Sequence, residues 1–305
     1  MKVPEHLKQW IIEQTLKKGF KSLSQHPQVP TSVLRHTMNM TAELLKVAPN
    51  VLIRSCRLAD CPAEQFNSVS KRANGQVILH VHGGAFFLGG LSSHRALGSQ
   101  LAQLTGATVY TIDYPLSPEQ VYPHAMLAVK NAVVELLAQG YKAEDIIISG
   151  DSCGGNLALA AVLALRDAGQ PVPAGMILMS PFLDLTLSGD SIRLNKSLDA
   201  MLNSEFLQRG INYYIGQYPA SHPLVSPLFA ELNNLPPTLV QAGSKEILLD
   251  DSKRFKELAQ AAGSKVTLNI YPGMWHVFQL FSQWSEPAKQ SLQEIAGFVA
   301  QLKEE

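Results

Sequence analysis

The sequence has no excess of charge of one sign, few cysteines and no long apolar run. Its 25 basic side chains balance its 25 acidic ones and form no long basic block, which argues against nucleic acid or an anionic membrane surface as the main partner. The three cysteines among 305 residues make no disulfide framework and favour a reducing compartment. No stretch approaches the roughly 18 uncharged apolar residues that a membrane-spanning helix needs.

Charged residues recur throughout the segment Met1 to Phe20. It shows neither the apolar core nor the small-residue cleavage site of a signal peptide, so we expect a cytoplasmic protein without stable membrane insertion. Hydrophobic residues make up 46% of the chain and charged residues 16%. This composition and length predict one large α/β domain with a sizeable core.

From Val51 onward, short β-rich runs alternate with helical patterns. The predicted strands are Val51–Arg57, Gln76–His82, Thr108–Asp113, Asp145–Ser149, Gly175–Met179, Pro237–Ala242 and Val266–Tyr271. The predicted helices are Ala125–Ala138, Asn156–Ala168, Asp251–Ala262 and Pro287–Leu302. Such alternation predicts a mainly parallel sheet covered by helices on both faces. The pair Asn74-Gly75 predicts a tight hairpin turn before the second strand.

Two segments stand outside this alternation. Residues 185–232 contain no convincing strand and carry several tyrosines and prolines, so we interpret them as an insertion between two strands. The segment from residue 1 to about 45 has helical spacing that is interrupted at Pro30. We expect the two segments together to form a helical cap over one end of the sheet.

The strongest local signal is the Gly-x-Ser-x-Gly motif at residues 150–154. It follows a predicted strand and precedes an Ala/Leu-rich helix, the setting in which a sharp turn presents a nucleophilic serine. This setting favours Ser152 as a nucleophile over the alternative, an ordinary glycine-rich turn.

A second signal is the pair Gly83-Gly84 at the end of a predicted strand. Acyl transfer builds negative charge on a carbonyl oxygen, which preorganised backbone N–H groups stabilise. Gly83 and Gly84, with the residue after the nucleophile, Cys153, are therefore the candidate oxyanion donors. Without the serine motif, the glycine pair would indicate only a loop.

A serine nucleophile needs a base and an acid that orients the base. Only His222 and His276 follow Ser152 in the sequence; His276 lies just after a predicted strand, whereas His222 lies in the proline-rich insertion and is better explained by a turn. Glu246 is the first acid after the strand that ends near residue 242. Asp250 is the alternative acid, but acids also occur in the first turn of a helix because of its dipole.

The remaining cysteines give no sign of a metal site. Cys56 and Cys61 are isolated from other ligand-type residues. Cys153 is expected to be a buried, inert thiol, because the turn exposes the preceding side chain instead. The predicted chemistry needs neither a metal nor an organic cofactor.

These motifs together resemble the hormone-sensitive-lipase group of α/β-hydrolases, the carboxylesterases called bacterial family IV. The resemblance rests on His82-Gly83-Gly84, on residues 150–155, on the segment 246–251 before Trp275-His276, and on residues 113–119, which are similar to Asp-Tyr-Arg-Leu-Ala-Pro-Glu. It implies the α/β-hydrolase fold with a helical cap. It also implies that Ser152 is the nucleophile, Glu246 the acid and His276 the base. By the same resemblance, the oxyanion donors are Gly83, Gly84 and Cys153.

Four positions depart from the family pattern. Ala85 replaces a third glycine and would be strained if its φ is positive. Cys153 replaces alanine, Glu246 stands where many members have aspartate, and Pro115 replaces an arginine, which removes a supporting charge.

The expected function is a serine carboxylesterase that hydrolyses small-molecule esters with short or medium acyl chains through an acyl-enzyme. Phe86 and Phe87 are expected to line an apolar acyl pocket. Two alternatives stay open: another acyl hydrolase (amidase, lactonase or deacetylase), and a non-catalytic ligand-binding protein on the same scaffold, although such proteins typically lose a triad member. The edge strand near Val266 is available for pairing between subunits, as in many relatives, so a homodimer also stays open.

Overall fold

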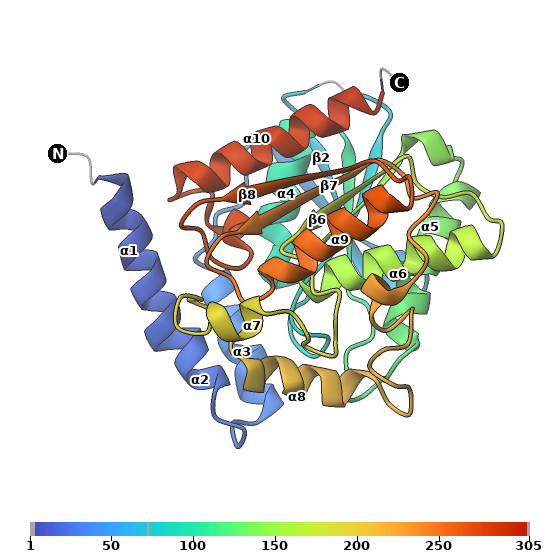
Figure 1. Cartoon of the computed structure of the whole chain (residues 1–305). Helices are drawn as coiled ribbons and strands as arrows, with labels where there is room; N and C mark the ends of the chain where they lie inside the picture. The colour runs from blue at the N-terminus through green and yellow to red at the C-terminus, as the bar shows by residue number, and fades with distance from the viewer. Residues whose placement is uncertain (1–3, 72, 304–305) are drawn as a thin grey trace.

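A computed structural model describes residues 4–71 and 73–303 and places eight strands in one sheet, in the order β1-β2-β4-β3-β5-β6-β7-β8 (Figure 1). The strands are β1 (Val51–Leu58), β2 (Cys61–Ser68), β3 (Val77–Val81), β4 (Thr108–Ile112), β5 (Ile146–Asp151), β6 (Gly175–Met179), β7 (Thr238–Gly243) and β8 (Val266–Tyr271). Strand β2 pairs antiparallel with β1 and β4, and all other neighbours are parallel. The predicted mainly parallel sheet is therefore confirmed.

Helices cover both faces of this sheet. The long helices are α4 (Leu91–Thr105), α5 (His124–Ala138), α6 (Cys153–Asp167), α9 (Leu249–Ala261) and α10 (Glu286–Gln301). Helices α4 and α10 pack together on one face, and α5, α6 and α9 cover the other (Figure 1). Every residue of β3 and β5 is buried, because a strand that lies between two helical layers must be apolar on both sides.

The structure differs from the sequence prediction in three details. Residues Asn74 and Gly75 form no hairpin, since β3 after them lies parallel between β4 and β5. The hairpin instead joins β1 to β2 through Ala59 and Asp60, whose φ angles are +50° and +60°. Strand β2, which lies between β1 and β4, was not predicted, because Pro62 near its start and the polar residues after it are untypical of a strand inside a sheet. Helix α4 was also not predicted.

The remaining helical elements lie outside the sheet layers or in its connections. They are α1 (Glu5–Leu16), a π-helical turn (Lys17–Lys21), α2 (Ser22–Ser24), α3 (Thr31–Ala42), α7 (Ser191–Leu194), α8 (Ser204–Tyr214) and the short 3₁₀ turns Ala143–Asp145, Pro227–Phe229 and Phe278–Phe281. None of the helices within residues 4–71 and 73–303 has the length and apolar character needed to cross a membrane.

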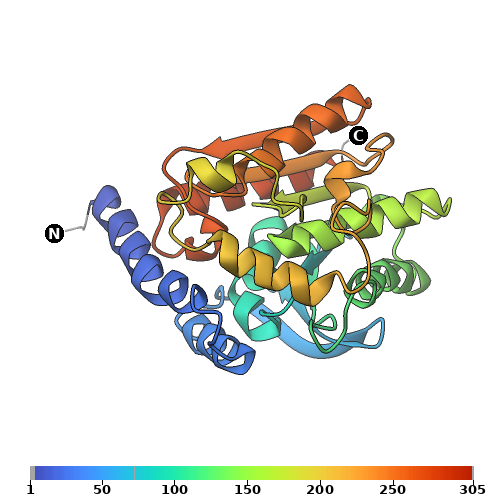
Figure 2. The same ribbon diagram turned by 60° about the horizontal axis from the view of Figure 1, so that its bottom comes forward.

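The N-terminal helices pack against the segment that contains α7 and α8. Figures 1 and 2 both place α3 next to α8. The ring of Phe20 meets the ring of Phe206 edge-on at 5.5 Å. The buried Lys21 donates to the carbonyl oxygen of Asp199 at 2.7 Å, and Arg209 donates to that of Val29 at 2.8 Å. These contacts join two segments that are far apart in the sequence.

The close packing of α6 against β3 gives a test of the fold. A Cβ atom at Gly154 would lie 2.1 Å from the carbonyl oxygen of Val81, a backbone atom held in the sheet. We expect Gly154→Ala to lower the free energy of unfolding by about 1–3 kcal/mol or more. Gly297→Ala is the matched control, because a Cβ there meets nothing within 4 Å and alanine should stabilise the helix by up to about 1 kcal/mol. Chemical denaturation measures both, and equal stability of the two variants would contradict this account.

Candidate active site

Ser152 occupies the sharp turn between β5 and α6. Its backbone has φ +53° and ψ −123°, a strained conformation for a residue other than glycine. The turn is tight because Gly150 lies against Gly154, where a Cβ would come within 2.4 Å of the backbone. The N–H of Ser152 donates to the carbonyl oxygen of Met179 at 2.9 Å, which ties the strained residue to the neighbouring strand.

His276 and Glu246 form a buried pair beyond the ends of β8 and β7. The Nδ1 atom of His276 lies 2.8 Å from Oε2 of Glu246, and Oε1 accepts from the N–H of Gly243 at 2.5 Å. Burial raises the pKa of Glu246, and the hydrogen bond from His276 opposes that rise. Since a carboxylate accepts, Nδ1 carries the proton and Nε2 is left as the basic nitrogen of the neutral ring.

The two alternative residues from the sequence lie elsewhere. Asp250, in the first turn of α9, accepts from the N–H of Ser191 at 2.8 Å and lies 3.6 Å from Nζ of Lys253. His222 accepts from the N–H of Leu224 at 3.2 Å, within a turn. The structure thus brings Glu246 to His276 and gives Asp250 and His222 local partners.

The loop that carries Glu246 is held by the insertion before α8. The side-chain amide of Asn195 donates to the carbonyl oxygen of Glu246 at 2.9 Å, and the carboxylate of Asp199 accepts from the N–H of Ile247 at 2.8 Å. These contacts fix the backbone on both sides of the acid. Sequence reasoning missed them because the partners are 48 to 51 positions apart and no motif marks them.

The predicted oxyanion donors differ in their hydrogen bonds. The N–H of Gly83 donates to Oδ1 of Asp151 at 3.1 Å. Gly84 follows with φ +130°, and within residues 4–71 and 73–303 its N–H meets no protein acceptor. Cys153 is the first residue of α6, where a helix leaves its N–H groups free. All three residues stay predicted donors, and the N–H groups of Gly84 and Cys153 are the ones without a protein partner among the described residues.

The loop after Gly84 is strained as the sequence anticipated. Ala85 has φ +51° and Phe86 has φ +69°, both in the region that favours glycine. The thiol of Cys153 accepts from the N–H of Phe86 at 3.1 Å, which holds the loop against the serine turn. Cys153 is fully buried, and burial raises its pKa to about 12. The thiol therefore acts here as a hydrogen-bond acceptor and not as a nucleophile.

An arginine from α3 supports the same loop from outside. Arg35 donates to the carbonyl oxygens of Phe87 at 2.8 Å and Ser117 at 3.0 Å. It also binds both carboxylate oxygens of Glu119, at 2.7 and 2.8 Å, and this pairing lowers the pKa of Glu119 to about 2. Pro115 removes the arginine of the family pattern, and Arg35 brings a guanidinium to this region from another part of the chain. The sequence contains no local signal for this contact.

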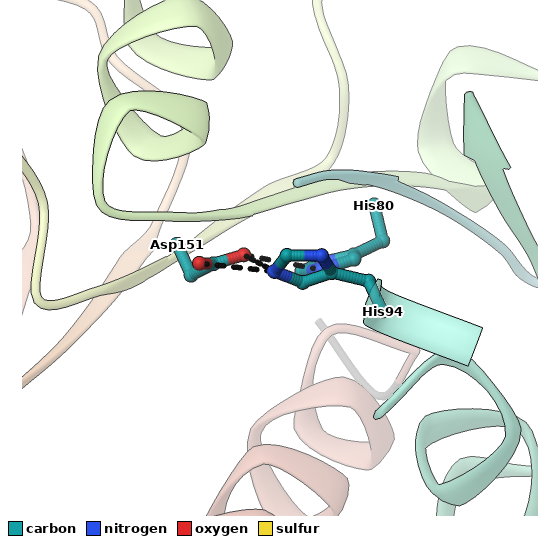
Figure 3. Close-up of side chains that lie close together, drawn as sticks. All are labelled: His80, His94 and Asp151. Carbon is teal, nitrogen blue, oxygen red and sulfur yellow. Dashed lines mark hydrogen bonds and ion pairs between the residues drawn. The ribbon is translucent and has the colours of Figure 1, made fainter. Parts of the chain in front are cut away.

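One group of side chains in the described residues has the composition of a metal site. Ligand atoms of His80, His94 and Asp151 all lie within 4.8 Å of one another (Figure 3). Oδ1 of Asp151 lies 3.2 Å from Nε2 of His94, a distance at which hydrogen bonding explains the approach. Nε2 of His80 lies 3.4 Å from the same oxygen, and this buried nitrogen has no hydrogen-bond partner in the described part of the chain. The absence of a metal requirement stays a prediction.

These parts suit one chemistry. A serine on a strained turn, a histidine whose proton position is set by a carboxylate, and free backbone N–H groups beside the serine are what acyl transfer needs.

Comparisons with known proteins agree with this chemistry. Residues 78–280 match the family model of the α/β hydrolase fold. The chain is 48% identical over 296 residues to an esterase of Acinetobacter venetianus, covering 97% of each chain, and 37% identical over 226 residues to an acetyl-hydrolase of Streptomyces hygroscopicus, covering 74% of this chain and 75% of that one. A solved esterase from the bacterial hormone-sensitive lipase family superposes with a TM-score of 0.92, at 31% identity and 99% coverage of both chains.

Arg35 gives a test that needs no substrate. Arg35→Ala removes its bonds to the loop at Phe87, so we expect backbone amides of residues 86–88 to exchange hydrogen at least about tenfold faster. Arg95→Ala is the control, because Arg95 makes a similar two-pronged contact with Glu64 and none with the loop. Hydrogen-exchange mass spectrometry measures both. Unchanged exchange of the loop in Arg35→Ala would contradict its supporting role.

Proposed function

Since the chain belongs to the hormone-sensitive lipase family of carboxylesterases, within the α/β hydrolases, we propose that it hydrolyses small-molecule acyl esters with Ser152 as nucleophile, His276 as general base and Glu246 as the orienting acid. The observation that carries this proposal is the 2.8 Å contact between His276 and Glu246, together with the strained turn that presents Ser152.

In the first half of the reaction, Nε2 of His276 takes the hydroxyl proton of Ser152 as Oγ attacks the ester carbonyl carbon. The carbonyl electron pair moves onto oxygen, and the N–H groups of Gly84 and Cys153 stabilise the negative charge. Collapse of this intermediate breaks the bond to the alcohol oxygen, which takes the proton from His276 and leaves. Ser152 is then acylated.

In the second half of the reaction, water takes the place of Ser152 as the attacking group and the same steps are repeated. His276 takes a proton from water, whose oxygen attacks the acyl carbon, and the new intermediate expels Oγ of Ser152, which regains the proton. The carboxylic acid leaves. The proposal requires Glu246 to be ionised, so that it stabilises the imidazolium of His276. Burial raises the pKa of Glu246, and the bonds from His276 and Gly243 oppose this rise and favour the charged form.

We propose a preference for short or medium acyl chains and a confined site beside the aromatic packing of the oxyanion loop. Phe86 stacks on Tyr214 with ring centroids 3.8 Å apart, and Phe87 packs against Phe206 at 5.4 Å. This aromatic packing joins the oxyanion loop to α8, which we propose is part of a helical cap formed by residues 1 to about 45 and about 185–232. The acetyl-hydrolase name of the Streptomyces relative supports the short-chain end of the range.

Ser152→Ala tests the nucleophile. We expect turnover of p-nitrophenyl esters to fall on the order of 10⁴-fold or more, with the wild type most active on short or medium acyl chains in a series from acetate to dodecanoate. Ser70→Ala, at an exposed serine, is the control and should keep full activity. Persistent turnover by a folded Ser152→Ala would assign the chemistry to another nucleophile.

A second pair of variants tests the acid. Glu246→Gln removes the charge that orients His276 and stabilises its cation, so we expect kcat to fall about 10²- to 10⁴-fold. Asp250→Asn breaks contacts with Ser191 and Lys253 only and should lower kcat less than about tenfold. Steady-state kinetics on one short-chain ester decides, and the reverse ranking would make Asp250 the acid.

A further inference from the structure

The carboxylate of Asp151, one position before Ser152, is almost completely buried and has several polar neighbours. Figure 3 shows it facing the rings of His80 and His94. It also accepts the N–H of Gly83 at 3.1 Å. One side chain therefore joins the end of β5, the start of the oxyanion loop and the first turns of α4.

Both ring nitrogens of His94 lie at hydrogen-bond distance from oxygen atoms. The hydroxyl oxygen of Ser93 lies 2.9 Å from the carbonyl oxygen of Gly90 and 2.8 Å from Nδ1 of His94. Nε2 of His94 faces the Asp151 carboxylate at 3.2 Å, and because a carboxylate only accepts, Nε2 donates to it. A second proton, on Nδ1, would make His94 a cation paired with a buried carboxylate.

The other groups that face this pair are neutral or distant. Burial lowers the pKa of His80; its Nε2 points to Asp151, and its Nδ1 lies 3.2 Å from the hydroxyl of Ser149. Burial and the charge of His94 lower the pKa of His82 to about 3. His82 donates from Nδ1 to the carbonyl oxygen of Gly83, and its Nε2 lies 3.9 Å from Asp113.

The charge of Asp151 persists despite its burial. Burial alone raises the pKa of Asp151, but the charge and hydrogen bond of His94, with the contact of His80, outweigh it and hold the pKa far below its usual range. A buried carboxylate without a cation would carry a large desolvation cost, so Asp151 depends on His94.

We propose that His94 carries this second proton, on Nδ1, and that its ion pair with Asp151 is a positioning device for the oxyanion loop. Asp151 holds the N–H of Gly83 and thereby aims the next N–H, that of Gly84, toward the substrate oxygen. His94 balances the carboxylate, so that no net negative charge lies beside the place where the oxyanion forms, where it would oppose catalysis. This role deepens the proposed function and rests on it.

The role predicts a specific kinetic effect. His94→Gln leaves the negative charge of Asp151 without its cation, so kcat falls at least about tenfold while KM changes less than about threefold, because the penalty applies to the transition state. His124→Gln makes the same chemical change at an exposed histidine and should leave both constants unaltered. A KM increase with unchanged kcat would overturn the proposal.

The charge argument is tested by a double-mutant cycle with Asp151→Asn. An asparagine at 151 still offers an oxygen to Gly83 but has no charge to balance, so His94→Gln should lower kcat less than about threefold in that background. An equal loss in both backgrounds means that His94 contributes only packing and overturns the proposal.

NMR of the wild-type protein with ¹⁵N-labelled histidine keeps the test independent of variant folding. We expect both ring nitrogens of His94 to be protonated at neutral pH, and a singly protonated ring would overturn the ion pair. The failures are distinguishable. A wild type that turns over no ester defeats the proposed function and this role with it, whereas an active wild type with an equally active His94→Gln defeats this role alone.

Discussion

Helix α6 comes so close to the backbone of β3 that its second residue must be glycine, and this contact decides where the reactive serine lies. Gly154 lies against the carbonyl of Val81, so the chain between β5 and α6 has room for one residue only. Ser152 takes that place with a strained backbone. The same approach sets the start of α6 beside Val81 and His82, just before Gly83 and Gly84. One packing contact thus positions the candidate nucleophile and the candidate oxyanion donors.

The strained backbone of the oxyanion loop and the loop of Glu246 are both held by hydrogen bonds from distant parts of the chain. Arg35 in α3 and the thiol of Cys153 hold the oxyanion loop, and Asn195 and Asp199 hold the loop of Glu246. Strained backbone persists only where its surroundings over-determine it. The N-terminal helices and the insertion therefore act on the candidate site through hydrogen bonds to its backbone, in addition to any contact with substrate.

Local chemistry explains what the sequence could predict. The parallel sheet, the turn at Ser152, and the positions of Glu246 and His276 after their strands follow from short patterns whose geometry is set within a few residues. Strand β2 was not predicted because it contains Pro62, and proline is rare inside strands. The pairing of Gly83 with Asp151 spans 68 positions and that of Arg35 with Phe87 spans 52. Such contacts depend on the packed tertiary structure, so no periodicity or motif in one sequence reveals them.

Helices α1–α3 contact residues that lie far along the chain, and this has a consequence for biosynthesis. During translation, residues 5–42 emerge well before Phe87, Asp199 and Lys245, the residues that Arg35, Lys21 and Glu13 contact in the finished protein. The contacts of Lys21 and Glu13 can form only after Asp199 and Lys245 have been synthesised. The N-terminal helices therefore cannot complete their packing until late in the synthesis of the chain.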